Sequence, residues 1–518
     1  MDITQGLRRA MQIRPNGAST VFRERRRTWR ETGERIARLA GGLSKIGLAK
    51  GDRAAILALN SDRYFEYLFA VPMAGGAVVP INTRLAAPEI QYILENSGAE
   101  ILFIDDRFAP MLDVLKGQMP SVRHVVYLGD GALPSGMRAY EDLLSVPPLT
   151  EPRACDDDLA GIFYTGGTTG KAKGVMLSHR NLVVNAANVV PAFGYDADSA
   201  YLHAGPMFHL ADGASTLAVT VVGGVHVFVP TFDPTDVLAT IQREKVTHSL
   251  LVPTMINLLV NFPKVANFDV SSLRRVAYGA SPMPEAVLRK ALQVLPGVKF
   301  AQAYGMTEAA PLVTALDPRY TTLEGPDAGR VKSCGQAGHL VEVRIADADD
   351  REVPRGTVGE VQVRGDNIML GYWNAPDLTA QALRGGWYHS GDGGYMDAEG
   401  FVYIVDRLKD MIITGGENVY SAEVENAIST LDGVAEVAVI GVPDEKWGEA
   451  VHAIVVPRAG KPVTADGVIA HCHGLIAGYK CPRGVTIRSE PMPISGAGKI
   501  LKTELRKPYW AGREKQVN

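Results

Sequence analysis

The sequence predicts a mixed α/β protein with a large N-terminal part made of several subdomains and a small α+β C-terminal part. A length of 518 residues exceeds what one hydrophobic core normally holds, so more than one folded unit is expected. Apolar strand-like runs alternate with helix-like segments over most of the chain, which is typical of an α/β layer structure. A charged stretch at 406–410 then separates a last unit from the rest.

The alternation begins near residue 19 and runs to about residue 151. We expect helices over 28–46 and 88–96, and short buried strands over 53–59, 77–81 and 101–104. After a glycine-rich loop, further strands are expected over 224–229, 249–252 and 275–278. Proline and a helical run follow each of the first two, which continues the same pattern.

The pattern changes between residues 341 and 363 to short strands with turn residues, such as 341–345 and 360–363. This change indicates a small β-rich subdomain. The last unit combines expected helices over 421–431 and 465–477 with expected strands over 434–440 and 451–456. We therefore predict one domain at 1–406, a connecting segment at 407–409 and a second domain at 410–518.

Composition and charge argue against several classes of function. With 46% hydrophobic and 21% charged residues and a net charge of −4, the chain gives no reason to expect a nucleic-acid surface. The N-terminus lacks the order of a signal peptide, and the longest apolar stretch, 64–81, is interrupted by Glu66 and two prolines. We expect no integral membrane segment and a cytoplasmic location, and leave a homodimer open.

The four cysteines are scattered along the chain, which fits a reducing compartment and not a disulfide framework. His471, Cys472 and His473 lie close to Cys481 in sequence, and this grouping invites a metal interpretation. Their spacing matches no standard zinc pattern, so ordinary helix-face residues are the expected interpretation.

A loop rich in glycine, threonine and lysine at 164–175 is the first candidate site. Glycines let main-chain N–H groups approach an anion closely, and the hydroxyl and ammonium groups add donors. A buried strand is expected directly before the loop and a helix from Asn181 onward, so the loop lies at a strand end. It is not a Walker A loop, because only three residues separate Gly166 from Gly170. A flexible turn is the alternative interpretation.

Three further segments carry groups that suit nucleotide chemistry. Segment 302–308 offers an aromatic ring for stacking, a hydroxyl for phosphate and a carboxylate for Mg²⁺, although it is also compatible with a plain strand end. Asp392 follows a glycine at an expected turn and can accept the hydroxyls of a ribose, with a turn-capping role as the alternative. Lys499 stands on a glycine-flanked loop, for which a mobile tail is the alternative.

Taken together, the order and spacing of these segments resemble the adenylate-forming superfamily of acyl-CoA synthetases, nonribosomal-peptide adenylation domains and firefly luciferase. The resemblance covers residues 15–506. The loop at 164–175 is similar to the family's phosphate loop, with Gly166 in place of its serine and Ala172 in place of its proline. The resemblance implies an AMP-forming acid–CoA ligase that uses ATP, Mg²⁺ and coenzyme A, and a mobile C-terminal domain that rotates between two half-reactions.

The resemblance also implies a role for each candidate residue. Implied catalytic residues are Lys499, Thr307, Glu308 and His209, with Glu308 also implied as the Mg²⁺ ligand. Residues implied to bind ATP or AMP are Thr165, Gly166, Gly167, Thr168, Thr169, Gly170, Lys171, Lys173, Gly279, Ala280, Ser281, Ala303, Tyr304, Asp392 and Arg407. Lys409 matches the hinge position, and Gly415, Gly416 and Glu417 match the lining of the CoA thiol tunnel.

The acyl pocket is expected to involve a set of small residues and one histidine: His209, Gly213, Ala303, Gly305 and Ala310. Small side chains leave room for an aliphatic or aryl tail, although small residues at turns are also explained by backbone geometry. Amino-acid-activating relatives carry aspartate directly after the position of His209, where this chain has Leu210, and Asp212 is two residues out of place. We therefore expect a fatty acid of medium or longer chain or an aryl acid as the substrate.

Other functions share the adenylation motifs. A stand-alone adenylation enzyme that loads a carrier protein in trans is the stronger alternative, and a luciferase-like oxygenase is another. A non-enzymatic AMP sensor is disfavoured, because Glu308 and Lys499 have little use without turnover.

Overall fold

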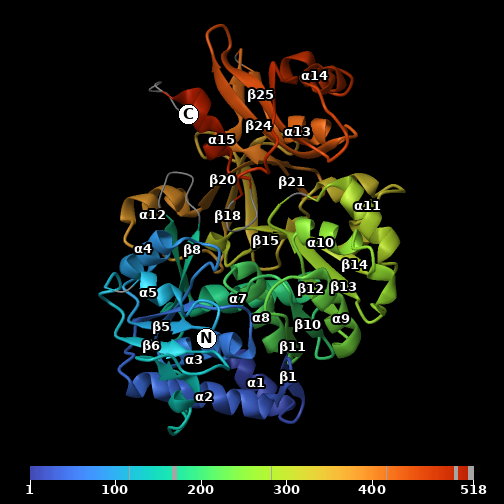
Figure 1. The fold of residues 1–518 in the computed structure, drawn as a ribbon. Coiled ribbons are helices and arrows are strands. Elements are labelled where there is room, and N and C mark those ends of the chain that lie inside the picture. Colours follow the sequence, from blue (N-terminus) through green and yellow to red (C-terminus); the bar gives the residue numbers. More distant parts are fainter. Residues whose placement is uncertain (116, 166–171, 282, 416, 495–499, 512–518) are drawn as a thin grey trace. The chain divides into compact units, whose positions relative to one another are not determined.

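The computed structural model describes the chain except residues 116, 166–171, 282, 416, 495–499 and 512–518 (Figure 1). The side chains of Lys409 and Asn418 also lie outside the description. The chain forms two compact units, one of residues 1–343 and 363–388, the other of residues 344–362 and 389–518. Each unit is described by itself below.

The first unit contains two large mixed sheets. The nine-stranded sheet has the order β16-β15-β14-β13-β12-β10-β11-β1-β2. Its strands are β1 (Ala18–Phe22), β2 (Arg25–Thr28), β10 (Ala200–His203), β11 (Val225–Phe228), β12 (His248–Leu250), β13 (Arg275–Gly279), β14 (Lys299–Gly305), β15 (Leu312–Leu316) and β16 (Gln336–Ala337). Strands β11, β10, β12, β13 and β14 run parallel, so their carboxyl ends lie along one edge.

The second sheet of this unit has eight strands in the order β19-β9-β8-β4-β3-β5-β6-β7. The strands are β3 (Arg53–Leu57), β4 (Ala77–Pro80), β5 (Ile101–Ile104), β6 (His124–Tyr127), β7 (Arg138–Ala139), β8 (Leu159–Thr165), β9 (Lys173–Ser178) and β19 (Gly371–Tyr372). Strands β3 to β8 pair in parallel, and β9 and β19 add an antiparallel edge.

Helices cover these sheets, and Figure 1 shows α9 to α11 beside β12 to β14. The helices of the unit are α1 (Gln5–Ile13), α2 (Trp29–Lys45), α3 (Asp62–Met73), α4 (Ala87–Ser97), α5 (Met111–Leu115), α6 (Tyr140–Leu143), α7 (His179–Phe193), α8 (Leu210–Val222), α9 (Pro234–Glu244), α10 (Pro253–Val260), α11 (Glu285–Val294) and α12 (Pro376–Ala382). Their apolar faces form continuous cores with the strands. Ile241 of α9 and Leu288 of α11, for example, share a core with Phe300 of β14.

Local sequence signals explain where the helices begin. Thr28 accepts a hydrogen bond from the amide of Glu31, whose carboxylate accepts one from the amide of Thr28 in return, and α2 starts at this capping box. Ser178 and Asn181 form the equivalent box at the start of α7. Helix α7 ends at Gly194, whose φ of 61° suits glycine.

The second unit contains a four-stranded sheet in the order β17-β18-β20-β21, and a five-stranded sheet in which β26 joins β23-β22-β25-β24. The strands are β17 (Glu342–Ala346), β18 (Gly359–Arg364), β20 (Tyr388–Met396), β21 (Val402–Arg407), β22 (Ile412–Thr414), β23 (Glu417–Val419), β24 (Val434–Asp444), β25 (Gly448–Pro457) and β26 (Gly484–Ile487). Its helices are α13 (Ser421–Ser429), α14 (Ala465–His473) and α15 (Lys502–Trp510). Cys472 and Cys481 are buried in the core of this unit.

Most of the predicted elements are confirmed, with ends shifted by a few residues. The expected helix at 465–477 is wrong at its end, because α14 stops at His473. The four-stranded sheet clusters with the C-terminal residues, whereas the prediction divided the chain at 406–410. The domain boundary and the pivot at 407–409 stay predictions. Among the described residues, no helix combines the length and apolar character needed to cross a bilayer.

Candidate functional site

The predicted phosphate loop joins two antiparallel strands. Thr165 at the end of β8 lies opposite Lys173 at the start of β9 in the register of the hairpin. Gly166, Gly167, Thr168, Thr169, Gly170 and Lys171 lie outside the described residues. The sequence placed a strand before the loop and a helix after it, but missed β9, which separates the loop from α7.

Glu308 lies in a 3-10 turn, Thr307–Ala309, directly after the chain leaves β14. The hydroxyl of Tyr372 donates a hydrogen bond of 2.9 Å to its Oε1 atom. Lys173 places its ammonium group 5.2 Å from the centre of the Tyr372 ring. The predicted metal ligand and a predicted ATP-binding lysine are thus linked through one aromatic side chain.

Sequence reasoning missed Tyr372. Its strand β19 pairs with β9, with Tyr372 opposite Val175, although the two segments are almost two hundred residues apart in the chain. The amide of Met369 also donates to the carbonyl of Glu308, at 2.8 Å. The only local signal was a glycine followed by two aromatic residues at 371–373, and such a short strand has no period to detect.

The predicted adenine-binding residues collect at the carboxyl ends of β13 and β14. Gly279 lies opposite Ala303 in the ladder, and a Cβ atom at Gly279 would lie only 2.4 Å from the carbonyl oxygen of Ala303. Ala280 continues with a φ of 67°, which turns the chain sharply and exposes Ser281. Tyr304 and Thr307 are half-buried. Ligands of parallel α/β sheets bind at this end of the strands.

Asp392 and Arg407 lie in the second unit, directly opposite each other in the antiparallel pair β20 and β21. The guanidinium Nε atom of Arg407 is 2.7 Å from the Oδ1 atom of Asp392. The expected turn at Asp392 is wrong: the residue stands inside β20, which is distorted by the φ of 69° at Gly391 and by a register shift between Gly393 and Gly394. A carboxylate and a guanidinium held side by side provide an acceptor and donors for vicinal hydroxyl groups.

The predicted hinge and CoA-tunnel residues of the second unit lie close to each other along the chain, at 409–417. Gly415 connects β22 to the segment before β23, and its φ of 61° and the Trp447 ring, 2.6 Å from where its Cβ would lie, both require glycine. Glu417 is exposed at the start of β23. The backbone of Lys409 lies in the 3-10 turn Leu408–Asp410, whereas Gly416 and Lys499 lie outside the described residues.

His209 stands directly before α8, half-buried, with its ring 4.7 Å from that of Phe208. The segment before it is fixed by Asn60, which accepts from the amide of Met207 at 2.8 Å and donates to the carbonyl of Gly205 at 2.7 Å. An ordered backbone at this point sets the direction of α8 and of the histidine ring.

The small residues expected in the acyl pocket differ in their surroundings. A Cβ atom at Gly305 would lie 1.9 Å from the carbonyl oxygen of Pro311, so backbone packing alone requires glycine there. Ala310 is fully buried and has a φ of 62°. Gly213 lies in α8, and a Cβ atom there would make only an ordinary contact with Leu210. Ala303 is half-buried. Their part in an acyl pocket stays a prediction.

Asp212 is a buried partner of core residues. Its carboxylate accepts from the hydroxyl of Tyr201 at 2.9 Å and lies 2.7 Å from the Nδ1 atom of His203. The other ring nitrogen of His203 is 3.0 Å from His226, and burial together with His203 lowers the pKa of His226 well below its ordinary value. The carboxylate of Asp212 is therefore engaged with core residues and is not placed to hold a substrate ammonium group.

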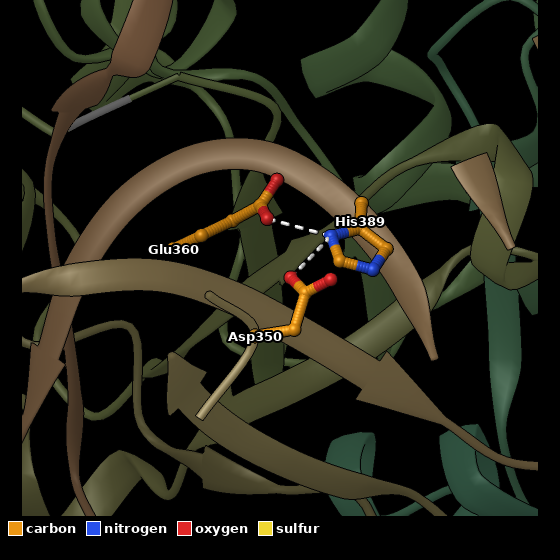
Figure 2. A group of neighbouring side chains, drawn as sticks. All are labelled: Asp350, Glu360 and His389. Carbon is orange, nitrogen blue, oxygen red and sulfur yellow. Dashed lines mark hydrogen bonds and ion pairs between the residues drawn. The ribbon is translucent and has the colours of Figure 1, made fainter. Parts of the chain in front are cut away.

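Asp350, Glu360 and His389 form a cluster in the second unit whose ligand-type atoms lie within 4.8 Å of one another (Figure 2). His389 Nδ1 is 2.7 Å from Glu360 and 3.7 Å from Asp350. The amide nitrogen of Gln362 lies 2.9 Å from Asp350, 3.3 Å from Glu360 and 3.1 Å from His389. The space between the three groups is thus taken by a donor, and the cluster is a hydrogen-bonded support for β20.

Comparison with known proteins gives matches over nearly the whole chain. The family model described as AMP-binding enzyme matches residues 7–373, and that of the AMP-binding enzyme C-terminal domain matches residues 423–499. A feruloyl-CoA synthase from Amycolatopsis sp is 40% identical over 93% of this chain and 94% of its own length. The long-chain-fatty-acid–CoA ligase FadD13 of Mycobacterium tuberculosis is 36% identical over 94% of both chains.

Solved structures agree with this assignment. The crystal structure of ATP-bound MatB from Rhodopseudomonas palustris superimposes with a TM-score of 0.87 at 29% identity, and covers 99% of each chain. The mixed α/β fold, with a large N-terminal and a small C-terminal domain, is therefore the fold of that enzyme.

Proposed function

Because the chain belongs to the AMP-binding enzyme family and is an AMP-forming acid–CoA ligase of the adenylate-forming superfamily, we propose that it converts aryl or fatty monocarboxylic acids into their CoA thioesters. The similarity to the feruloyl-CoA synthase supports the proposal, and for this reason we propose aryl acids as the first candidate. The similarity to FadD13 supports a fatty acid as the second candidate.

The proposed reaction has two steps, both limited by charge and orientation. The substrate carboxylate attacks the α-phosphorus of ATP, and pyrophosphate leaves with the broken P–O bond. The thiolate of CoA then attacks the acyl carbon, and AMP leaves. In the first step two anions meet, so the ammonium of Lys499 and the donors of the loop after Thr165 neutralise charge and hold the reactants in line.

Other residues orient the nucleotide. The proposed roles are stacking of Tyr304 on the adenine, contact of Thr307 with the α-phosphate, and binding of the ribose hydroxyls by the paired Asp392 and Arg407. These proposals are supported by the half-buried faces of Tyr304 and Thr307 at the strand ends and by the ladder position of the pair.

Glu308 fits a magnesium ion, because its side chain is half-buried, its carboxylate accepts from the hydroxyl of Tyr372, and it offers the hard oxygen atoms that Mg²⁺ prefers. A bound Mg²⁺ supplies positive charge to phosphate oxygens. The part of this chain is to orient the carboxylate, which Tyr372 does from β19.

Replacing Glu308 by glutamine should raise the Mg²⁺ concentration needed for half-maximal pyrophosphate release and slow adenylation. Tyr372→Phe keeps the ring beside Lys173 and removes only the hydroxyl that orients Glu308. We expect about a tenfold effect in the same direction, the size of a lost hydrogen bond to a charged group. Magnesium titrations of the initial rate measure both. Unaltered magnesium dependence in both variants would assign Glu308 to structure alone.

The acid preference is tested by a panel of acids assayed for pyrophosphate release with and without CoA. Ferulate, cinnamate, octanoate and palmitate should be activated, whereas acetate and phenylalanine should not. Leu210 stands where an ammonium partner would be needed, and Asp212 is engaged in the core. Carrier loading would be favoured by two results together: CoA does not increase the turnover of pyrophosphate release, and the acid is transferred to a carrier protein.

Enlarging Ala303 should move the preference to shorter or narrower acids. Ala303 is half-buried at the end of β14, so a leucine there takes volume from the proposed pocket. Each CH₂ group is worth about 0.8 kcal/mol when buried, so kcat/KM of the parent should rise severalfold per carbon until the pocket is full. The dependence of kcat/KM on chain length is measured with saturated acids in the parent and in Ala303→Leu. The same dependence in both would show that Ala303 does not line the pocket.

A further inference from the structure

A dense polar network connects three separate segments of the second unit: Asp406 at the end of β21, Ser421 and Glu425 in α13, and Lys502 at the start of α15. We call these four residues the Asp406 network. Asp406 and Ser421 are buried, with 8% and 0% of their surfaces exposed. Asp406 lies three residues before the proposed pivot at Lys409, and Lys502 lies three residues after Lys499.

Asp406 caps helix α13 from outside the helix. Its Oδ2 atom accepts hydrogen bonds from the amide of Ser421, from the Ser421 hydroxyl at 2.6 Å and from the amide of Ala422 at 3.4 Å. The residue at the cap position itself, Tyr420, makes no side-chain cap hydrogen bond. A carboxylate at a helix N-terminus stabilises the unpaired amides and the positive end of the helix dipole.

Lys502 extends the network to α15. Its ammonium group donates to the Ser421 hydroxyl at 2.6 Å and lies 2.7 Å from the Oε1 atom of Glu425. Glu425 also accepts from the amide of Val439 at 2.7 Å, and burial raises the pKa of its carboxyl against the opposing effect of Lys502. The Ser421 hydroxyl therefore donates to Asp406 while it accepts from Lys502.

A second ion pair provides the contrast. Arg506, one turn further along α15, lies 2.9 Å from the Oδ1 atom of Asp410. Both its members follow residue 409 in the chain, so rotation about that residue carries them together. Asp406 precedes residue 409, whereas Ser421, Glu425 and Lys502 follow it. Rotation of the backbone between them therefore moves Asp406 away from the amide and hydroxyl of Ser421 and the amide of Ala422.

We propose that the Asp406 network is a positioning latch for the two half-reactions: it stabilises one of the two domain arrangements and must open before the other forms. This inference rests on the proposed function, because it needs the two half-reactions of that function and the pivot at Lys409 that the family resemblance implies. Because Lys502 is part of the latch, the latch also holds the start of α15. This helix begins three residues after Lys499. Asp406, Ser421 and Lys502 act through the arrangement they stabilise and need not touch a substrate.

The test measures domain arrangement without any substrate. Spin labels are attached to the exposed Cys155 and to a cysteine introduced by Ala470→Cys, an exposed position of α14. Interspin distances are then recorded in the parent, Asp406→Asn, Ser421→Ala and Ser421→Thr. We expect Asp406→Asn and Ser421→Ala to change the ratio of the two distance populations by about 5- to 30-fold, and Ser421→Thr, which keeps the hydroxyl, to restore the parent ratio.

Asp410→Asn is the matched control, since it makes the same substitution in an ion pair that lies wholly beyond residue 409 and whose side chains are 14% and 15% exposed. It should leave the distance populations as in the parent. The ratio of the adenylation rate to the rate of thioester formation from supplied acyl-adenylate should shift with the distance populations in the first two variants only. Identical populations in all variants, or an equal shift in Asp410→Asn, would overturn the latch.

The proposed function and the latch can be contradicted independently of each other. If the parent released no pyrophosphate with any acid, the proposed function would fall, whereas the distance measurement would still decide the latch. Because Asp406→Asn removes the charge of a helix-capping carboxylate, its thermal unfolding is compared with that of Ser421→Ala. A shift in population shared by both variants, in protein that remains folded, supports the latch independently of stability.

Discussion

Lys499→Ala should lower the rate of acyl-adenylate formation by about 10²–10³-fold, the loss expected when one transition-state donor is removed. The ammonium of Lys499 is proposed to bridge the attacking carboxylate and the α-phosphate, where no other cation of this chain is proposed. Thioester formation from supplied acyl-adenylate should remain largely intact, because that step is proposed to occur in the other arrangement. Single-turnover measurements of the two half-reactions give both numbers.

Lys502→Met is the informative companion variant. It removes a charge three residues from Lys499, but one that is engaged with Ser421 and Glu425. We expect it to alter the balance of the half-reactions without the full loss seen in Lys499→Ala. An equal loss of both half-reactions in Lys499→Ala would contradict the assignment of that lysine to adenylation only.

Lys409→Pro should leave adenylation active and reduce thioester formation by about 10²-fold or more, the loss that a misplaced reaction centre produces. Proline fixes φ near −65° and also restricts Leu408, so a backbone that must rotate there is held in one arrangement. The comparison is Lys409→Ala, which removes the side chain and keeps the rotation. Separate assays of pyrophosphate release and CoA thioester formation measure the effect.

Normal rates of both steps in Lys409→Pro would show that the pivot lies elsewhere. The latch would then require a different pivot that still lies between Asp406 and Ser421. Distances between the labelled sites in Lys409→Pro provide an independent check. A single population, against two in Lys409→Ala, would confirm that this residue permits the change.

Prediction from sequence succeeded where a local pattern carries the information. The buried strands β3, β5 and β13 are short apolar runs, and α2 begins at a capping box that can be read from four residues. The motifs at 164–175 and 302–308 are continuous in sequence, so their residue types could be interpreted before any fold was known.

Prediction from sequence failed where a segment distant in the chain changes the local conformation. Strand β9 follows a loop of glycines and lysines and is stabilised by pairing with β8 and β19 on its two sides. The glycine before Asp392 predicts a turn, yet pairing with β21 keeps Asp392 in an extended strand opposite Arg407. The glycine at 305 is required by the carbonyl of Pro311, which packs against it from another segment, whereas its part in an acyl pocket stays a prediction.

By itself the sequence determined the class of fold, the order of the motifs and the family to which they belong, because these follow from hydrophobic periodicity and from residues adjacent in the chain. Only the tertiary structure decided the pairing of Asp392 with Arg407, the support of Glu308 by Tyr372 and the capping of α13 by Asp406. Each of these contacts joins segments that sheet pairing or helix packing brings together, and their geometry is set by the whole core. No local pattern of residues encodes that geometry.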